Sequence, residues 1–194
     1  MSEARDDAEL LGLIARGEVR ALGELYDRYS STLFPIALRI LRERSEAEDV
    51  LHDAFVAVSE RAGQFAPERG SVVAWLVTLV RNLSIDRTRR RERRGALVRE
   101  VLPFEPPASV PDPERLTAEA GERHAIRRAL AALPEAQRKT LEVAFFEGLS
   151  YPEIAERENV PLGTIKSRAA RALAALRDAL AAEGMVLEDI GKGG

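Results

Sequence analysis

Positively charged side chains gather in two runs along the 194-residue chain, in a pattern that suits contact with nucleic acid. Residues 81–99 hold eight arginines and two acids, and residues 160–177 hold four basic residues and no acid. Arginine and lysine bind the phosphates and base edges of DNA. A solvated helix face explains either run alone. Two runs, each at the end of a helical pattern, favour a nucleic-acid-binding protein.

Acidic side chains fill the segments outside these runs. Residues 1–60 hold thirteen acids against seven arginines, and residues 100–122 hold six acids against one arginine. Taken alone, the net charge of −3 argues against binding to nucleic acid. The separation of acidic and basic segments reverses that argument, because a partner that contacts one basic run meets the charge of that run and not the net charge of the chain.

The chain offers little for catalysis. It has no cysteine and only two histidines, His52 and His124, which excludes cysteine nucleophiles and disulfides and argues against a multi-histidine metal site. A metal-dependent nuclease built on Asp49, His52 and Asp53 is one alternative. Residues one and three apart share a helix face only in part, which disfavours it. We expect no metal, no cofactor and no enzymatic activity.

Helices must carry these side chains, because apolar residues recur at helical spacing and no segment alternates as a strand does. The segment Pro103–Leu116 contains five prolines, so no regular element is expected there. No apolar run reaches the roughly 18–20 residues of a membrane span, and the acidic N-terminus does not resemble a signal peptide, so we expect a cytoplasmic protein. The predicted divisions are a helical domain at 1–95, a flexible linker at 96–117, a second helical domain at 118–184 and a tail at 185–194.

Local signals place several helix ends. Capping boxes are predicted at Ser45–Glu48 and at Ser150–Glu153, where a hydroxyl and a carboxylate exchange hydrogen bonds with backbone amides. A short helix follows the second box, a turn follows at Asn159–Val160, and a last helix opens at Pro161 and extends to about residue 182. Two helices joined by so short a turn form a helix-turn-helix.

The last helix separates into two faces. An apolar stripe is expected to pack inward, formed by Ile165, Ala169, Ala172, Leu173, Leu176 and Leu180. The opposite face, near the N-terminal end, carries Lys166, Ser167, Ala170 and Arg171. A recognition helix presents such residues to the major groove, where lysine or arginine reads guanine and alanine packs on a thymine methyl. A helical hairpin with a basic solvent face is the alternative, and the preceding short helix and turn favour DNA binding.

The chain resembles a bacterial sigma factor of the extracytoplasmic-function (ECF) type, which keeps the second and fourth sigma regions. In the first domain the resemblance rests on AEDVLHDAF (47–55), GSVVAWL (70–76) and VRNLSID (80–86). In the second it rests on LPEAQR (133–138), GLSYPEIA (148–155) and PLGTIKSR (161–168). The order of these six segments, with the proline-rich gap between the two groups, is specific for this family. The resemblance implies a region 2 bundle, a region 4 helix-turn-helix, and three partners: RNA polymerase core enzyme, promoter DNA and an anti-sigma factor.

The resemblance also implies three sets of binding residues. Docking on the coiled coil of the polymerase clamp is expected from Glu48, Asp49, His52 and Asp53. Contact with the −10 element, including a flipped base held by the loop 64–70, is expected from Phe65, Arg69, Asn82, Asp86, Arg87, Arg89, Arg90 and Arg91. Contact with the −35 element is expected from Thr164, Lys166, Ser167, Arg168, Ala170 and Arg171. We expect Trp75 to be a core residue.

Two further alternatives concern the linker and the class of regulator. In this family the linker passes through the polymerase cleft, and an acidic, proline-rich strand suits a positively charged channel; a plain spacer is the other interpretation. A response regulator with the same helix-turn-helix would need an α/β receiver domain. The all-helical first domain does not provide one.

Overall fold

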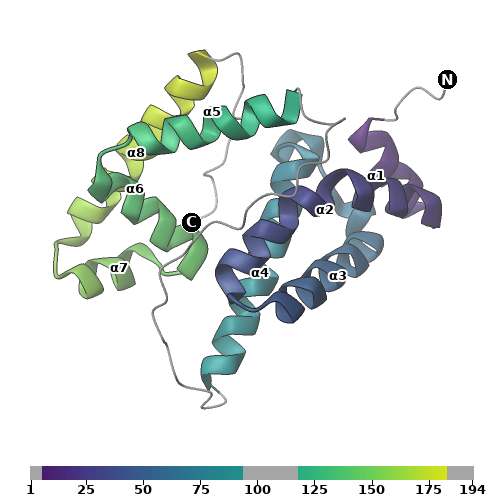
Figure 1. Cartoon of the computed structure of the whole chain (residues 1–194), viewed down its shortest axis with the longest axis horizontal. Helices are drawn as coiled ribbons and strands as arrows, with labels where there is room; N and C mark the ends of the chain where they lie inside the picture. The colour runs from purple at the N-terminus through teal and green to yellow at the C-terminus, as the bar shows by residue number, and fades with distance from the viewer. Residues whose placement is uncertain (1–5, 94–117, 183–194) are drawn as a thin grey trace. The chain divides into compact units, whose positions relative to one another are not determined.

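The computed structural model describes residues 6–93 and 118–182, and the regular elements within these ranges are all helices (Figure 1). The chain divides into two compact units, of which the first contains 6–93 and the second contains 118–182. The predicted all-α architecture is therefore confirmed. The predicted linker and tail, and the exact domain ends, lie outside the described residues. Among the described helices, none is long and apolar enough to span a bilayer.

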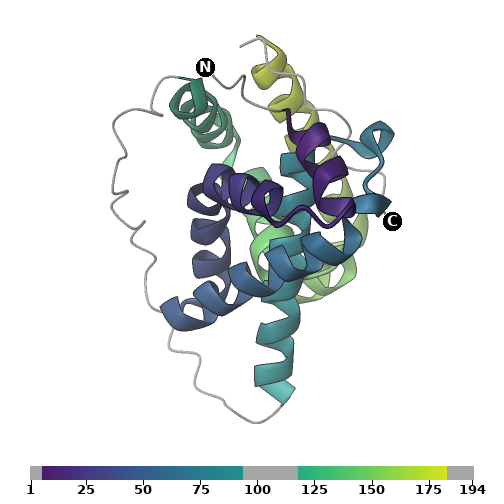
Figure 2. The ribbon, with the colours of Figure 1, turned by 90° about the vertical axis from the view of Figure 1, so that its right-hand side faces the viewer.

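The first unit packs its helices around one apolar core. Its elements are α1 (Asp7–Ala15), α2 (Val19–Leu41), α3 (Arg44–Arg61), the 3₁₀ turns η1 (Ala62–Gln64) and η2 (Pro67–Arg69), and α4 (Val72–Arg93). The long helix α2 packs against α1, α3 and α4 (Figures 1 and 2). Side chains with almost no exposed surface come from all four helices and include Leu10, Leu25, Leu33, Val50, Val58, Leu76 and Val80.

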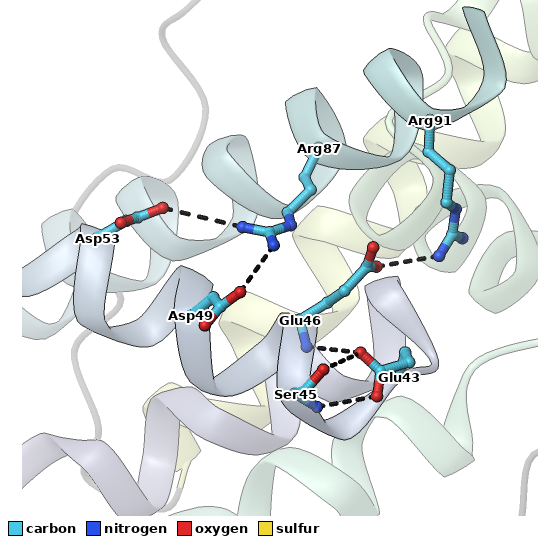
Figure 3. A network of polar contacts seen from close by, with 7 residues as sticks. All are labelled: Glu43, Ser45, Glu46, Asp49, Asp53, Arg87 and Arg91. Carbon is cyan, nitrogen blue, oxygen red and sulfur yellow. Dashed lines mark hydrogen bonds and ion pairs between the residues drawn. The ribbon is translucent and has the colours of Figure 1, made fainter. Parts of the chain in front are cut away.

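The N-terminus of α3 is capped by a residue that the sequence pattern did not indicate. Glu43 is the N-cap, and its carboxylate accepts hydrogen bonds from the backbone N–H groups of Ser45 and Glu46 and from the Ser45 hydroxyl (Figure 3). The predicted capping box at Ser45–Glu48 is therefore wrong, because Ser45 already lies inside the helix. Glu48 instead pairs with Arg44 at 2.8 Å.

The described part of the second unit is built from five helical elements. They are α5 (Ala118–Ala132), α6 (Glu135–Glu142), the π-helical segment η3 (Val143–Glu147), α7 (Tyr151–Glu158) and α8 (Leu162–Ala182). Gly148 ends η3 with φ +68°, a left-handed conformation that glycine adopts without a steric penalty. The predicted capping box at Ser150 and Glu153 is confirmed, with both of its reciprocal bonds present.

Two small apolar clusters hold this second unit together. Val143, Ile154, Ala155 and Ile165 join η3, α7 and α8. Ala125, Ala129 and Leu180 join α5 to the C-terminal half of α8. The helix α8 therefore belongs to both clusters, which fixes which of its faces remains exposed.

Candidate nucleic-acid and protein interfaces

The N-terminal half of α8 presents the predicted basic face to solvent. Lys166, Ala170 and Arg171 are exposed, whereas Ser167 and Thr164 are half-buried. The Ser167 hydroxyl donates to the Thr164 carbonyl at 3.0 Å. On the opposite side of α8, the apolar stripe includes the fully buried residues Ile165, Ala169 and Ala172. The predicted inward face is confirmed for these three residues and for Leu180, whereas Leu173 and Leu176 are only half-buried.

A three-residue turn joins α7 to α8. Asn159 ends α7 with φ +52°, and the Val160 N–H donates back to the Ala155 carbonyl at 3.0 Å. Pro161 then supplies the carbonyl that accepts from the Thr164 N–H at 2.8 Å. Because each of these groups is bonded locally, the turn has a defined geometry, and α8 leaves it in one direction.

Arg168 lies apart from the other predicted −35 residues. Its guanidinium pairs with the Glu158 carboxylate at 2.8 Å, and the two side chains are 24% and 16% exposed. Glu158 is the last residue of α7, so the pair bridges the two helices of the helix-turn-helix. Arg168 therefore sits at the contact between α7 and α8, while Lys166 and Arg171 face solvent.

In the first unit, the structure brings together residues predicted for two different partners. Arg87 on α4 donates to Asp49 on α3 at 2.8 Å and lies 4.0 Å from Asp53 (Figure 3). One turn further along α4, Arg91 pairs with Glu46 at 3.0 Å. Two of the predicted polymerase-docking acids, Asp49 and Asp53, thus pair with one predicted DNA-binding arginine, and a second such arginine pairs with Glu46, which was not a docking candidate.

Another side of α3 carries the remaining docking candidates. Glu48 and His52 are exposed, and Glu48 borders an open depression of about 390 Å³ between α2 and α3. This depression is lined by Tyr26, Ser30, Ser31, Phe34, Arg44, Glu48 and Leu51. The guanidinium of Arg44 lies over the Phe34 ring, 5.4 Å from its centroid. Sequence reasoning missed the aromatic residues of α2 as part of this surface.

The loop that connects α3 to α4 is held by packing and by two tight turns. The Phe65 ring lies 5.8 Å from the Trp75 ring, and both residues are half-buried, so Trp75 packs against the core as expected but is not one of its buried residues. Gly70 has φ +128°, which a side chain would strain. Ser71 caps α4 by accepting from the Ala74 N–H at 3.3 Å.

The exposed polar candidates lie along α4. Asn82 and Asp86, one turn apart, are both exposed, as are Arg89 and Arg90 further along the helix. The Asn82 side-chain oxygen accepts from the Arg81 guanidinium at 3.0 Å, and burial lowers the pKa of Arg81. The side chain of Arg69, another −10 candidate, lies outside the described part of the structure.

The nuclease alternative finds no support in this geometry. Within residues 6–93 and 118–182, no group of three or more histidine, aspartate or glutamate side chains could hold a metal ion. Asp49 and Asp53 face Arg87, while His52 between them is exposed on its own.

Comparison with known proteins decides the family. Residues 25–94 match sigma-70 region 2, and residues 123–176 match sigma-70 region 4. The protein named ECF RNA polymerase sigma factor SigK from Mycobacterium sp. (strain KMS) is 33% identical over 175 residues, which cover 88% of this chain and 89% of that protein. The chain belongs to the ECF sigma factor family. The SigK of Mycobacterium tuberculosis (strain H37Rv) is also 33% identical to this sigma factor, over 174 residues covering 88% of the chain and 91% of that protein.

Two solved structures are also similar to most of the chain. Rhodobacter sphaeroides SigE, determined in complex with the anti-sigma ChrR, is 33% identical, covers 91% of this chain and 99% of its own, and has a TM-score of 0.47. CnrH, determined with the cytosolic domain of CnrY, is 25% identical with a TM-score of 0.41, covering 91% of this chain and 98% of its own. In this sigma factor, α2–α4 carry the region 2 match, and the region 4 match runs from α5 into α8.

Proposed function

We propose that this sigma factor binds core RNA polymerase through α3 of region 2, opens the −10 element with the loop before α4, and reads the −35 element with α8. The exposed face of α8 carries the proposal, because Lys166, Ala170 and Arg171 face solvent while the opposite stripe is buried. The protein acts in the cytoplasm and has no catalytic activity of its own. An anti-sigma factor that covers α3 and α8 would block both polymerase and DNA.

The chemistry of the α8 face suits the edges of base pairs. Lys166 and Arg171 offer donors that match the two acceptors of guanine, and the Ala170 methyl can pack against a thymine methyl. Ser167 lies between them with its hydroxyl donated to Thr164, which leaves the hydroxyl oxygen able to accept a hydrogen bond. Because these residues lie in the first turns after the helix-turn-helix turn, they occupy the part of a recognition helix that enters the major groove.

The region 2 residues divide into two kinds of contact. Exposed Arg89 and Arg90 supply phosphate contacts, which give affinity without sequence preference and weaken with salt. The loop 64–70, together with Asn82, supplies the pocket for a flipped base. Extrusion of a base costs a few kcal/mol, which a fixed pocket must offset. Support for a fixed loop comes from Phe65 against Trp75 and from the capped start of α4.

Polymerase docking by the acids of α3 has a consequence for DNA binding. Asp49 and Asp53 are the partners of Arg87 in the free protein. A basic surface of the polymerase that binds these acids competes with Arg87 for the same carboxylates. Docking therefore releases Arg87 toward DNA, and the two interfaces of region 2 become linked through one side chain.

Promoter opening tests the division of roles in region 2. Holoenzyme assembled from core polymerase and the sigma factor is incubated with promoter DNA, and unpaired thymines at the −10 element are detected with permanganate. A Gly-Ser replacement of residues 66–69 keeps Phe65 in place; we expect it to bind the closed promoter without opening it. Replacement of Arg89 and Arg90 by alanine is the matched comparison, and it should weaken binding while opening persists at saturating holoenzyme.

The outcomes separate the possibilities. Normal opening by the loop variant, or an arginine variant that binds without opening, would contradict the proposed roles within region 2. Failure of the wild-type protein to direct core polymerase to any defined start site would contradict the function as a whole. Far-ultraviolet circular dichroism of each variant shows that the helices remain folded.

A further inference from the structure

The pair formed by Glu158 and Arg168 differs from an ordinary surface ion pair. The nitrogen and oxygen atoms are 2.8 Å apart, and three-quarters or more of each side chain is covered. The second carboxylate oxygen of Glu158 is buried and has no hydrogen-bond partner among the described residues. A comparable pair in the same unit, Glu147 with Arg157, also joins residues ten apart, but its side chains are 39% and 40% exposed.

The position of Glu158 makes its partner necessary. It is the last residue of α7, where the helix dipole disfavours an acidic side chain. Covering the carboxylate adds a desolvation cost. Both effects are compensated only while the Arg168 guanidinium stays in place, so the pair constrains the distance between the end of α7 and the second turn of α8.

The other contacts between these two helices are less directional. Ile154, Ala155 and Ile165 form a small apolar cluster, which holds the helices together but tolerates small rotations. Arg168 lies on the flank of α8, between the buried stripe and the exposed face, because successive helical residues turn by about 100°. An ion pair at that flank resists rotation of α8 about its own axis.

We infer that Glu158 and Arg168 form a positioning pair for promoter recognition, which fixes the rotation of α8 and thereby the side chains that it presents to the −35 element. Arg168 acts through α7 and not as a base or phosphate contact. The inference rests on the proposed function of α8 in reading the −35 element. It replaces the expectation that Arg168 itself binds DNA.

The test measures sequence preference, because a change of net charge alters affinity for all DNA. Holoenzyme is titrated with two fluorescent promoter duplexes, one carrying the matched −35 element and one with a base pair of that element changed. The recorded quantity is the Kd for the changed duplex divided by the Kd for the matched duplex. We expect Glu158→Gln and Arg168→Gln each to lower this ratio about three- to tenfold, and their combination to be no worse than either alone.

The charge-swapped protein, E158R with R168E, gives the sharpest comparison. Its net charge equals that of the wild type, and arginine at the end of α7 suits the helix dipole. We expect its preference to return to within about twofold of the wild type, since the pair is restored. The control is Glu147→Gln with Arg157→Gln, which removes the exposed pair and should leave the ratio unchanged.

Different outcomes refute different statements. One outcome would show that Arg168 is a DNA contact and that the inference is wrong. In that outcome, Arg168→Gln weakens binding to the matched and the changed duplex equally and lowers the salt dependence by about one phosphate contact, while Glu158→Gln does not reduce the ratio. If circular dichroism shows that the swapped protein has lost helicity, the test rests on the two glutamine variants and their combination. Effects on the ratio that add in the combination would show that the two residues act independently, which contradicts the inference. A wild-type ratio near one would instead refute the proposed −35 function.

Discussion

Neutralising the acids that hold Arg87 is expected to strengthen DNA binding by the free sigma factor. The change is Asp49→Asn combined with Asp53→Asn, which removes both carboxylates from the Arg87 guanidinium (Figure 3). Without these two carboxylates, Arg87 becomes more available to a DNA phosphate. The same change should weaken binding to core polymerase, because it removes two of the proposed docking charges.

The size of the effect follows from the geometry of the pair. A charge separation of 2.8 Å corresponds to about 1.5 kcal/mol in bulk water. The side chains of Arg87 and Asp49 are 35% and 61% exposed, so screening and side-chain entropy reduce the net value. Exposed pairs measured in other proteins contribute about 0.2–1 kcal/mol. The release of Arg87 is therefore worth at most about fivefold in affinity for DNA.

The assay is fluorescence anisotropy of a promoter duplex titrated with the free protein at low salt. A generic effect of two lost negative charges must be separated from the release of Arg87. Glu18→Gln with Glu60→Gln provides that control, since both residues are exposed acids of the first unit, neither forms an ion pair with Arg87 within the described residues, and the change in net charge is identical. The excess of the Asp49 and Asp53 variant over this control is the measured quantity.

A double-mutant cycle with Arg87→Gln decides the cause. If Arg87 carries the effect, the excess disappears in the Arg87→Gln background, because nothing remains to be released. An excess that persists there, or a variant that matches the control in the first place, would show that Arg87 and the acids are not coupled to DNA binding.

Further expectations concern region 4 and helix capping. Lys166→Ala and Arg171→Ala should each cost about 1–3 kcal/mol in holoenzyme binding to the matched −35 element and relax its base preference; unchanged preference in both would exclude base contact. Ser150→Ala removes the capping box of α7 and should lower the free energy of unfolding by about 1 kcal/mol in urea titrations. Hydrogen bonds from the Ser45 hydroxyl and from backbone amides lower the pKa of Glu43, so its contribution to stability is present above the ordinary glutamate pKa and is lost as pH falls through the lowered value. A Glu43→Gln variant should show a smaller loss of stability on acidification, measured by thermal melting.

Helical periodicity predicts much of this fold because burial and spacing agree. The stripe on α8 that contains Ile165 and Ala169 is buried as its spacing requires. Capping was harder to predict, since two candidates lie close together at the start of α3. Ser45 and Glu48 match the usual pattern, yet Glu43 has the extended backbone that an N-cap needs, and its carboxylate reaches two amides at once.

The candidate sites could be predicted where exposure on a single helix defines them. They could not be predicted where they depend on how two helices pack against each other. Lys166 and Arg171 face solvent because the helix itself determines their direction. The pairing of Arg87 with Asp49 depends on how α3 and α4 lie side by side, at a separation of 38 residues in sequence. A sequence pattern shows that one helix carries acids and another carries arginines. It does not show how the two helices are positioned along each other, which is what brings Arg87 within 2.8 Å of Asp49.

The distribution of paired and exposed cations gives a physical order to the proposed events. Arg87 and Arg91 in region 2 are held by acids of α3, whereas Arg90 on the same helix is exposed. We therefore expect the free protein to offer DNA only part of its positive charge and to bind DNA up to about fivefold more weakly than it would with Arg87 released. A polymerase surface that binds Asp49 and Asp53 removes the competing carboxylates, and the phosphate-binding capacity of α4 rises when the polymerase is in place. If the proposed docking acids and DNA-binding arginines are right, this competition favours binding to polymerase before promoter, without any change in the fold of region 2.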